Sequence, residues 1–361
     1  MGHLLTGISL FTGAGGMDVG FHQAGVLTLF ANELDHQAAE TYRSNTKYFN
    51  GDVMHEGDIV DYLDLLTTYN GADIVYGGPP CQGFSVAGKM DPDDKRSQLI
   101  WTFMDVVEKI RPRLFVMENV KALGKLQKWA SVRQRLAKRA ETLGYGYTFE
   151  ILCASDYGVP QARERFVMLG IKNAPSTDVA QVFADEMKKQ IKKAPTVREA
   201  ISKLPRFGSE GNCTGSTAAI RLARHPIVRS SPYQGSLLFN GRGRLVNLDA
   251  VSKTLPAQMG GNHTPIIDQR LLDDPTDYNW TESYLQKLKR KQSDPDVTDI
   301  EIPDTLRRMT VAEAAAVQTF PRDFSFTGPY GSQYRQIGNA VPCDFAFAIA
   351  QGAIGTLNSF A

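Results

Sequence analysis

The first 171 residues are dominated by one pattern, in which apolar runs of strand length alternate with longer segments of helical period. This alternation is typical of βαβ units, which build a mainly parallel sheet covered by helices. We therefore expect six or seven strands here. They are predicted near Leu4–Leu10, Leu27–Ala31, shortly before Asp52, and at Asp73–Tyr76, Leu114–Met117, Tyr145–Leu152 and Phe166–Ile171. The clearest helices are predicted over Arg96–Ile110 and Gln127–Leu143.

This rhythm ends after residue 172, where Pro, Gly, Ser, Asn and Arg become frequent and apolar runs shorten. A second, smaller domain is expected to begin there. Helical order is expected to return in Thr310–Gln318, and Cys343–Leu357 is predicted to be a final apolar helix that packs back on the first domain. A chain of 361 residues, 42% of them hydrophobic, is long enough for one large core and a smaller unit.

The sequence carries no pattern typical of export, membrane insertion or a cysteine-bound metal. Residues 1–10 lack the basic start and long apolar core of a signal peptide, and no apolar run approaches eighteen residues. The four cysteines, at positions 81, 153, 213 and 343, are too widely spaced for a metal knuckle and too few for a disulfide framework. We expect a cytoplasmic protein with reduced thiols, no bound metal and no membrane contact.

The charge distribution is more informative than the net charge of +1, because nucleic-acid binding needs a local basic face. Between Lys188 and Lys253, thirteen Lys or Arg residues stand against three Asp or Glu residues. This excess could hold a polyanion. For the lysine-rich stretch 188–193, a solvated linker is the better interpretation.

The first predicted strand leads into a glycine-rich turn, Phe11-Thr12-Gly13-Ala14-Gly15-Gly16. Such a turn at the start of a helix lets backbone N–H groups approach a ligand closely, which favours a nucleotide-like cofactor. Glu33 is placed at the end of the second strand, where a carboxylate can accept both hydroxyls of a ribose, and Asp52 at the next strand end. A turn used for packing alone is the alternative. A dinucleotide fingerprint would require glycine at position 18, where this chain has Asp18.

The fourth predicted strand runs into Gly77-Gly78-Pro79-Pro80-Cys81-Gln82-Gly83-Phe84-Ser85. Ligands of open parallel sheets bind outside the carboxyl ends of the strands, so the Cys81 thiol is a candidate nucleophile. Gly83 and Gly88 would let the segment up to Ser97 move as a lid. A buried cysteine with only a packing role is the alternative.

The fifth predicted strand ends in Glu118-Asn119-Val120, which places a carboxyl group near Cys81 if the two strands are neighbours. The last strand is preceded by Gln161-Ala162-Arg163-Glu164-Arg165. Alternate side chains of an extended segment point the same way, so both arginines can face the site and bind a phosphate or a carbonyl oxygen. A structural ion-pair network is the alternative.

Six motifs in this order resemble the DNA (cytosine-5)-methyltransferase family, of the bacterial restriction-modification type. They are FTGAGG, GGPPCQGFS, ENV, QARER, RRMTVAEAAAVQTFP and QYRQIGNAVP, and they cover about residues 1–171 and 305–361. The resemblance implies the α/β fold of S-adenosylmethionine-dependent methyltransferases, a Rossmann-like, mainly parallel sheet with a smaller target-recognition domain. It divides the chain into a catalytic and cofactor-binding domain (1–190 and 331–361), a target-recognition domain (191–305) and a hinge region (306–330).

The resemblance also implies a mechanism. Cys81 is expected to attack carbon 6 of a cytosine flipped out of duplex DNA, while Glu118 engages ring nitrogen 3 and carbon 5 accepts the methyl group. Arg165 is expected at the cytosine carbonyl oxygen and Arg163 at Glu118 or a backbone phosphate, and these two roles could be exchanged. The base that removes the hydrogen of carbon 5 is not identified, and a water could serve.

The family's cofactor is S-adenosyl-L-methionine, which leaves as S-adenosyl-L-homocysteine. The resemblance places Phe11 against the adenine, Glu33 on the ribose and Asp52 near the adenine amino group. The residues expected around the methionine end are Gly13, Ala14, Gly15, Gly16 and Asn339. Pro79 and Leu99 complete the expected cofactor contacts, Leu99 through the match RSQL, for which plain helix packing is the alternative.

Target recognition is expected near residues 190 to 305, where Thr254-Leu255 resembles the Thr-Leu pair that such domains share. The expected DNA contacts are Gln82, Ser85, Arg221, Arg224, Arg229, Arg242, Arg244 and Thr254. Each arginine could contact a phosphate, read a guanine in the major groove, or be exposed without touching DNA. The expected partner is double-stranded DNA, bound by a monomer, with a restriction endonuclease acting on the same site.

Three other functions fit parts of the sequence. A methyltransferase of the same fold acting on tRNA would keep the chemistry, but Gln82-Gly83-Phe84-Ser85 differs from the Cys-Phe-Thr signature linked with tRNA enzymes. A catalytically silent DNA-binding protein is disfavoured because the candidate catalytic residues are all present. An NAD-dependent oxidoreductase is the most distant alternative, because the dinucleotide fingerprint is incomplete.

Overall fold

The computed structural model of the protein describes residues 4–80, 98–213, 215–291 and 301–361. Its centre is a seven-stranded sheet in the order β3-β2-β1-β4-β5-β8-β6. The strands are β1 (Leu5–Leu10), β2 (Val26–Glu33), β3 (Met54–Glu56), β4 (Ile74–Gly77), β5 (Leu114–Val120), β6 (Tyr145–Cys153) and β8 (Glu164–Lys172). Only β8 runs antiparallel to its neighbours in this sheet, so the predicted mainly parallel α/β fold is confirmed.

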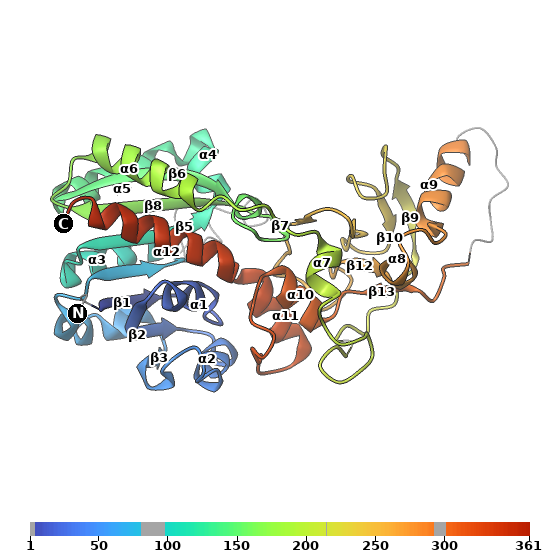
Figure 1. The fold of residues 1–361 in the computed structure, drawn as a ribbon, viewed down its shortest axis with the longest axis horizontal. Helices are drawn as coiled ribbons and strands as arrows, with labels where there is room; N and C mark the ends of the chain where they lie inside the picture. Colours follow the sequence, from blue (N-terminus) through green and yellow to red (C-terminus); the bar gives the residue numbers. More distant parts are fainter. Residues whose placement is uncertain (1–3, 81–97, 214, 292–300) are drawn as a thin grey trace.

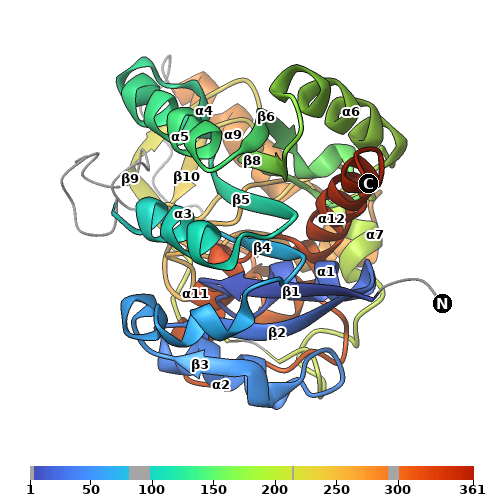
Figure 2. The same cartoon turned by 90° about the vertical axis from the view of Figure 1, so that its left-hand side faces the viewer.

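Helices cover both faces of the sheet (Figure 2). One face packs on α3 (Leu99–Ile110), α4 (Lys121–Lys125) and α5 (Ala130–Thr142), and the other on α1 (Gly16–Gln23), α6 (Ser176–Lys189) and α12 (Cys343–Asn358). The helix α2 (His36–Ser44) lies beside β2 and β3. A Cβ atom added to Gly20 would lie 2.4 Å from the backbone nitrogen of Phe347, so α1 and α12 pack with almost no space between them. The prediction that the final helix packs back on the first domain is therefore confirmed.

A second lobe lies at the other end of the long axis of the molecule (Figure 1). Its elements are α7 (Val197–Ile201), β9 (Leu222–Ile227), β10 (Leu237–Phe239), β11 (Ser252–Lys253), β12 (Ile266–Asp268), α8 (Gln269–Asp273), α9 (Trp280–Lys291) and β13 (Leu306–Arg308). The lobe has its own apolar core, which includes Phe239, Ile266 and Leu285.

The two lobes meet through α10 (Val311–Val317), α11 (Tyr330–Asn339) and the short strand β7 (Gln161–Ala162), which pairs in parallel with β11. A third apolar core continues from Tyr42 beside the sheet through Ile337 to Leu255 of the second lobe. The remaining short 3-10 helices are η1 (Gly51–Val53), η2 (Ile59–Tyr62), η3 (Leu65–Tyr69), η5 (Gln127–Trp129) and η6 (Ala154–Asp156).

Most predicted elements agree with the structure, but the third strand was placed wrongly. It was expected before Asp52, whereas β3 begins two residues after it and Asp52 lies in η1. The helix predicted from Gln127 begins as the 3-10 turn η5 before α5. The segment predicted over Thr310–Gln318 is α10, which starts with a capping box between Thr310 and Glu313.

The segment Tyr330–Asn358, which contains α11 and α12, is long and apolar enough to cross a membrane by length and composition. Of its most apolar window, 72% is buried inside the protein. This is the burial of a core helix.

Candidate active site

In the glycine-rich turn after β1, some glycines pack against neighbouring residues and one faces open space. Gly13 and Gly15 have positive φ angles of 56° and 87°, which favour glycine. A Cβ atom at Gly15 would meet the ring of Phe49 at 2.6 Å, and one at Gly16 would meet the carbonyl oxygen of Val341 at 2.5 Å. At Gly13 such an atom would meet nothing within 4 Å. The packing interpretation therefore fits Gly15 and Gly16, while Gly13 faces open space.

The carboxylate of Glu33 is fixed beside this turn at the end of β2. Its Oε2 accepts the N–H of Gly13 at 2.7 Å, and its Oε1 accepts the N–H groups of Leu34 and Asp35 at 2.9 and 2.8 Å. Burial raises the pKa of Glu33, while these backbone hydrogen bonds act in the opposite direction. A carboxylate held in this way keeps lone pairs that can accept ligand hydroxyls.

Asp58, and not Asp52, lies at the carboxyl end of β3. The register pairs Glu56 with Glu33, and the N–H of Gly57 donates to the carbonyl oxygen of Glu33 at 2.9 Å, so Asp58 follows at the same edge as Glu33. The Oδ1 of Asp58 accepts the N–H of Val60 at 3.0 Å. The expected position of Asp52 at a strand end is therefore wrong.

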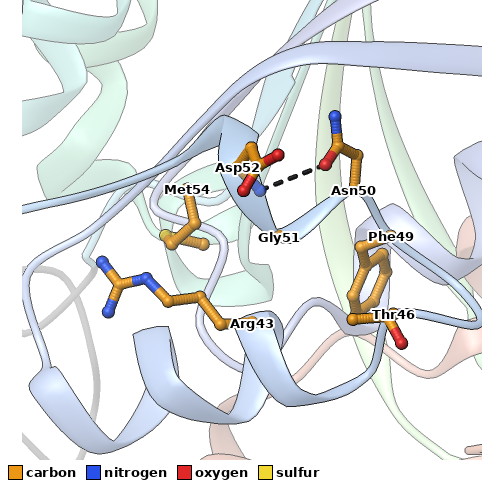
Figure 3. A pocket seen from close by; sticks show the side chains of 7 residues that line it. All are labelled: Arg43, Thr46, Phe49, Asn50, Gly51, Asp52 and Met54. Carbon is orange, nitrogen blue, oxygen red and sulfur yellow. Dashed lines mark hydrogen bonds between the residues drawn. The ribbon is translucent and has the colours of Figure 1, made fainter.

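Asp52 instead lines a separate hollow of about 560 Å³ between α2 and η1 (Figure 3). There its N–H donates to Asn50 Oδ1 at 3.1 Å, and the hollow is also lined by Arg43, Thr46, Phe49, Gly51 and Met54. No residue of the glycine-rich turn lines this hollow.

Glu118 and Arg165 form an ion pair at the carboxyl edge of the sheet. The Nε of Arg165 lies 2.7 Å from Oε1 of Glu118, which is only 8% exposed. A Cβ atom added to Gly78 would lie 3.0 Å from the other carboxylate oxygen. The Nδ2 of Asn119 also donates to the carbonyl oxygen of Pro79 at 3.1 Å. The chain segment that leads to Cys81 thus runs against the Glu118 carboxylate.

Three predicted residues of this segment, Cys81, Gln82 and Ser85, lie outside the described residues. Leu99 begins α3, where it is half-buried against the apolar core, as the packing alternative expects.

Arg163 has a different environment from Arg165. It is 3% exposed and donates to the carbonyl oxygens of Leu255 and Gly338 at 3.3 and 3.0 Å. The ion pair with Glu118 is made by Arg165, whereas the sequence assigned the ordering of Glu118 to Arg163 and left an exchange of the two roles open. Arg163 thus ties the second lobe to the end of α11, where the exposed Asn339 lies.

The arginines predicted to bind DNA lie in the second lobe around the β9–β10 hairpin. Arg221, Arg224, Arg229 and Arg242 are exposed, and in the part of the chain that the structure describes none of them forms an ion pair with a carboxylate. Arg244 is half-buried, and its Nη1 donates to the carbonyl oxygen of Arg242 at 2.7 Å. Burial lowers the pKa of Arg244. The Oγ1 of Thr254 donates to the carbonyl oxygen of Ala162 at 3.1 Å.

One group of possible metal ligands is His36, Glu40 and Glu56, whose ligand atoms lie within 4.8 Å of one another. The Nη1 of Arg43 bonds to Glu40 and Glu56 at 2.6 and 2.8 Å. The positive charge at this position is therefore already supplied by a guanidinium.

Known proteins resemble this chain over most of its length. The model of the C-5 cytosine-specific DNA methylase family matches residues 5–354. The chain belongs to this family. Among curated relatives, Type II methyltransferase M1.HphI of Haemophilus parahaemolyticus is 32% identical over 97% of this chain and 87% of its own. Type II methyltransferase M.Eco47II of Escherichia coli is 31% identical over 99% of this chain and 80% of its own.

The solved structure of the S. pombe Dnmt2 methyltransferase shares the fold, with a TM-score of 0.65, 17% identity and coverage of 99% of both chains. This DNA cytosine-5 methylase thus keeps the family's sheet, and the resemblance seen in its motifs is confirmed.

Sequence reasoning missed several residues of the methylase. The sequence did not distinguish Asp58 from Asp52, because a Gly-Asp pair stands on each side of the short strand β3, as Gly51-Asp52 and Gly57-Asp58. Arg307 forms a buried two-point ion pair with Glu313, at 2.8 and 2.6 Å. The capping pattern of Thr310 and Glu313 was the available signal for that pair. Gln161 and Gln318, hydrogen-bonded at 2.8 Å, gave no signal because 157 residues separate them.

Proposed function

We propose that this methylase transfers a methyl group from S-adenosyl-L-methionine to carbon 5 of a cytosine flipped out of a specific duplex DNA site. The observation that carries the proposal is the Glu118–Arg165 pair, 2.7 Å apart, with Gly78 against its carboxylate three residues before Cys81. An acid that is held by a guanidinium, next to the segment leading to a cysteine, suits covalent activation of a pyrimidine ring.

The cofactor site that we propose follows the carboxyl edge of β1, β2 and β3. Gly13 leaves its Cβ direction open, and the carboxylate of Glu33 beside it is already fixed by three backbone N–H groups. Phe11, Ala14, Gly15, Gly16, Pro79, Leu99 and Asn339 complete the proposed cofactor residues. We assign the adenine-side carboxylate to Asp58 in place of Asp52. When bound there, S-adenosyl-L-methionine supplies an electrophilic methyl group.

The protein's own groups would act in sequence on the cytosine. The Cys81 thiolate forms a bond to carbon 6, and the electron pair displaced from the ring double bond makes carbon 5 nucleophilic. A proton held by Glu118 at ring nitrogen 3 offsets the negative charge that this addition creates. Arg165 orients Glu118 and donates to the cytosine carbonyl oxygen. After methylation, loss of the proton from carbon 5 and release of the thiolate restore the ring.

Duplex DNA would be held by the second lobe, which we propose as the target-recognition domain, residues 191–305. Flipping a base out of the stack costs a few kcal/mol, so contacts to the surrounding duplex must offset that cost. The exposed arginines of the lobe, which lack carboxylate partners among the described residues, are suited to phosphate contacts. Thr254, beside Ala162, would place the lobe next to the catalytic strand end.

We further propose a modification role in a restriction-modification system, because both curated relatives are named Type II methyltransferases. The enzyme would act in the cytoplasm as a monomer, alongside an endonuclease that cuts the same site.

Covalent trapping tests the proposed chemistry. A duplex with 5-fluorocytosine at the target should give a denaturant-stable complex, since fluorine cannot leave as a proton. Cys81→Ala should abolish both the complex and turnover, while calorimetry still detects S-adenosylhomocysteine binding. The matched control is Cys213→Ala, which removes an exposed cysteine of the second lobe and should trap normally. A trapped complex with Cys81→Ala would refute attack by Cys81, and trapping on tRNA alone would favour the RNA alternative.

A further inference from the structure

We propose that Gln161 and Gln318 are positioning residues that couple DNA recognition to cofactor binding, an inference that rests on the proposed function. Gln161 lies in β7, four residues before Arg165, and Gln318 follows α10. Both side chains are 0% exposed. Together they join three parts of the molecule that the sequence keeps far apart.

The two glutamines form an unbroken chain of hydrogen bonds. The N–H of Leu255, in the second lobe, donates to Gln161 Oε1 at 3.0 Å. The Nε2 of Gln161 donates to Gln318 Oε1 at 2.8 Å. The Nε2 of Gln318 donates in turn to the carbonyl oxygens of Ile337 and Ala340, at 2.5 and 3.2 Å. We call this chain the glutamine relay.

The orientation of both amides in the relay is fixed by its ends. The N–H of Leu255 can only donate, so Gln161 must present its oxygen there. The carbonyl oxygens of Ile337 and Ala340 can only accept, so Gln318 must present its nitrogen to them. The central bond therefore runs from Gln161 to Gln318, and flipping either amide would break a buried hydrogen bond at both of its ends.

The relay ends on the part of α11 that the proposed function places at the cofactor. The last carbonyl groups of a helix have no partner within the helix. Here Gln318 donates to the carbonyl oxygen of Ile337 and to that of Ala340, the residue after the helix. The Arg163 guanidinium donates to those of Gly338 at 3.0 Å and Asn339 at 3.5 Å. The end of α11 that carries Asn339 is thus held by Arg163, which directly follows β7, and by Gln318, the C-cap residue of α10.

The end of α11 also packs tightly against the segment of the second lobe that follows Thr254. A Cβ atom added to Gly338 would lie 2.4 Å from the carbonyl oxygen of Pro256. Arg163 donates both to Gly338 and to the carbonyl oxygen of Leu255. A shift of the segment after Thr254 must therefore move the end of α11, or break buried hydrogen bonds. DNA bound against Thr254 would in this way set the position of Asn339.

From the glutamine relay we expect positive coupling, in which bound DNA raises the affinity of the protein for the cofactor. The coupling factor is the dissociation constant of S-adenosylhomocysteine without DNA divided by its dissociation constant in the presence of a duplex that contains the site methylated by the enzyme. Calorimetry measures both constants. In the wild type it should exceed about five, the lower end of common allosteric couplings. Gln161→Met and Gln318→Met, which keep side-chain size and remove the amide, should bring it close to one.

The control is Gln181→Met, because Gln181 is an exposed glutamine of α6 bonded to Asp185. It should leave the coupling factor unchanged. The double variant Gln161→Met/Gln318→Met should lose no more coupling than either single variant, since the two residues act in one chain. Gln161→Asn replaces the Met variants if these fail to fold, because its amide remains but is one methylene too short.

Two results would overturn the relay while leaving the methylase function intact: a wild-type coupling factor of one, or folded variants that keep the wild-type factor. A wild type that methylates no duplex would instead overturn the proposed function and the relay with it. A purely structural role would lower the unfolding temperature of the variants without changing the coupling factor.

Discussion

In the proposed mechanism, Glu118 holds a proton next to ring nitrogen 3 of the cytosine. It is 8% exposed, its carboxylate is paired with Arg165 at 2.7 Å, and Gly78 lies against its free side. A fixed acid of this kind can hold a proton at a defined place on a substrate.

Glu118→Gln keeps the shape and the hydrogen bonding of the side chain but removes the acid. We expect kcat to fall by about 10² to 10⁴, the usual contribution of a general acid. Binding of S-adenosylhomocysteine should change less than about twofold, because the proposed mechanism places Glu118 at the base and not at the cofactor. Single-turnover methyl transfer and calorimetry measure the two effects. Glu108→Gln, an exposed acid on α3, is the control, and full turnover by Glu118→Gln would contradict the assignment.

Asp58 and Asp52 offer a direct comparison of two acids that flank one short strand. Asp58 follows β3 at the edge that carries Glu33, whereas Asp52 lies in η1 before the strand. We expect Asp58→Ala to weaken S-adenosylhomocysteine binding about tenfold, the effect of losing one charged hydrogen bond of about 1.5 kcal/mol. Asp52→Ala should bind within about twofold of wild type. The reverse order in calorimetry would restore Asp52 to the cofactor site.

The helix α1 carries a buried acid in its first turn, directly after the glycine-rich turn. Asp18 is 0% exposed, and its Oδ1 accepts the hydroxyl groups of Tyr42 and Tyr76 at 3.3 and 3.1 Å. Burial raises the pKa of Asp18 to about 6, although hydrogen bonds from Ser9 and the two tyrosines act against the rise.

Asp18 should therefore make stability fall as the pH rises. Its pKa in the folded protein is above the ordinary aspartic acid value of 3.8, so its stabilising effect is complete below about pH 4 and is lost as the pH approaches 6. At about 1.4 kcal/mol per pKa unit, the loss is at most about 3 kcal/mol. Urea unfolding of wild type and Asp18→Asn should show the wild type losing stability relative to the variant between pH 4 and 6. A constant difference would contradict the assigned pKa.

Element prediction from sequence succeeded where apolar runs were long and failed where a strand was short. β5 and β8 are long strands of the sheet interior, and their continuous apolar runs located them. β3 has three residues, too few for a pattern, and a Gly-Asp pair at each end made its position ambiguous. Glu33 and Glu118 could be placed at the carboxyl edge of the sheet from the sequence, because Glu33 ends β2 and Glu118 lies two residues before the end of β5.

The contacts between the two lobes could not be predicted, because they join residues far apart in the sequence. Gln161 and Gln318 are 157 residues apart, and Arg163 and Gly338 are 175 apart. Spacing could place Arg163 and Arg165 on one extended segment, but only the fold separates them into a lobe contact and a partner of Glu118. The boundaries assigned to the target-recognition domain remain a prediction.

DNA binding should depend on the exposed arginines of the second lobe. Each arginine that contacts a phosphate contributes about one unit to the slope of log K against log salt. We expect Arg224→Ala, on β9, to lower that slope by about one and to weaken cognate and non-cognate duplexes equally. Fluorescence anisotropy over a salt series measures this effect. Weakening confined to the cognate duplex would instead identify Arg224 as a base-reading residue.

The proposed activity is tested most directly by bisulfite sequencing of plasmid DNA from a bacterial host that lacks cytosine methylation and expresses this chain. We expect cytosines protected from conversion in one short recurring sequence, and no protection with Cys81→Ala. Complete conversion of every cytosine, with soluble and folded wild-type protein in the cells, would contradict it.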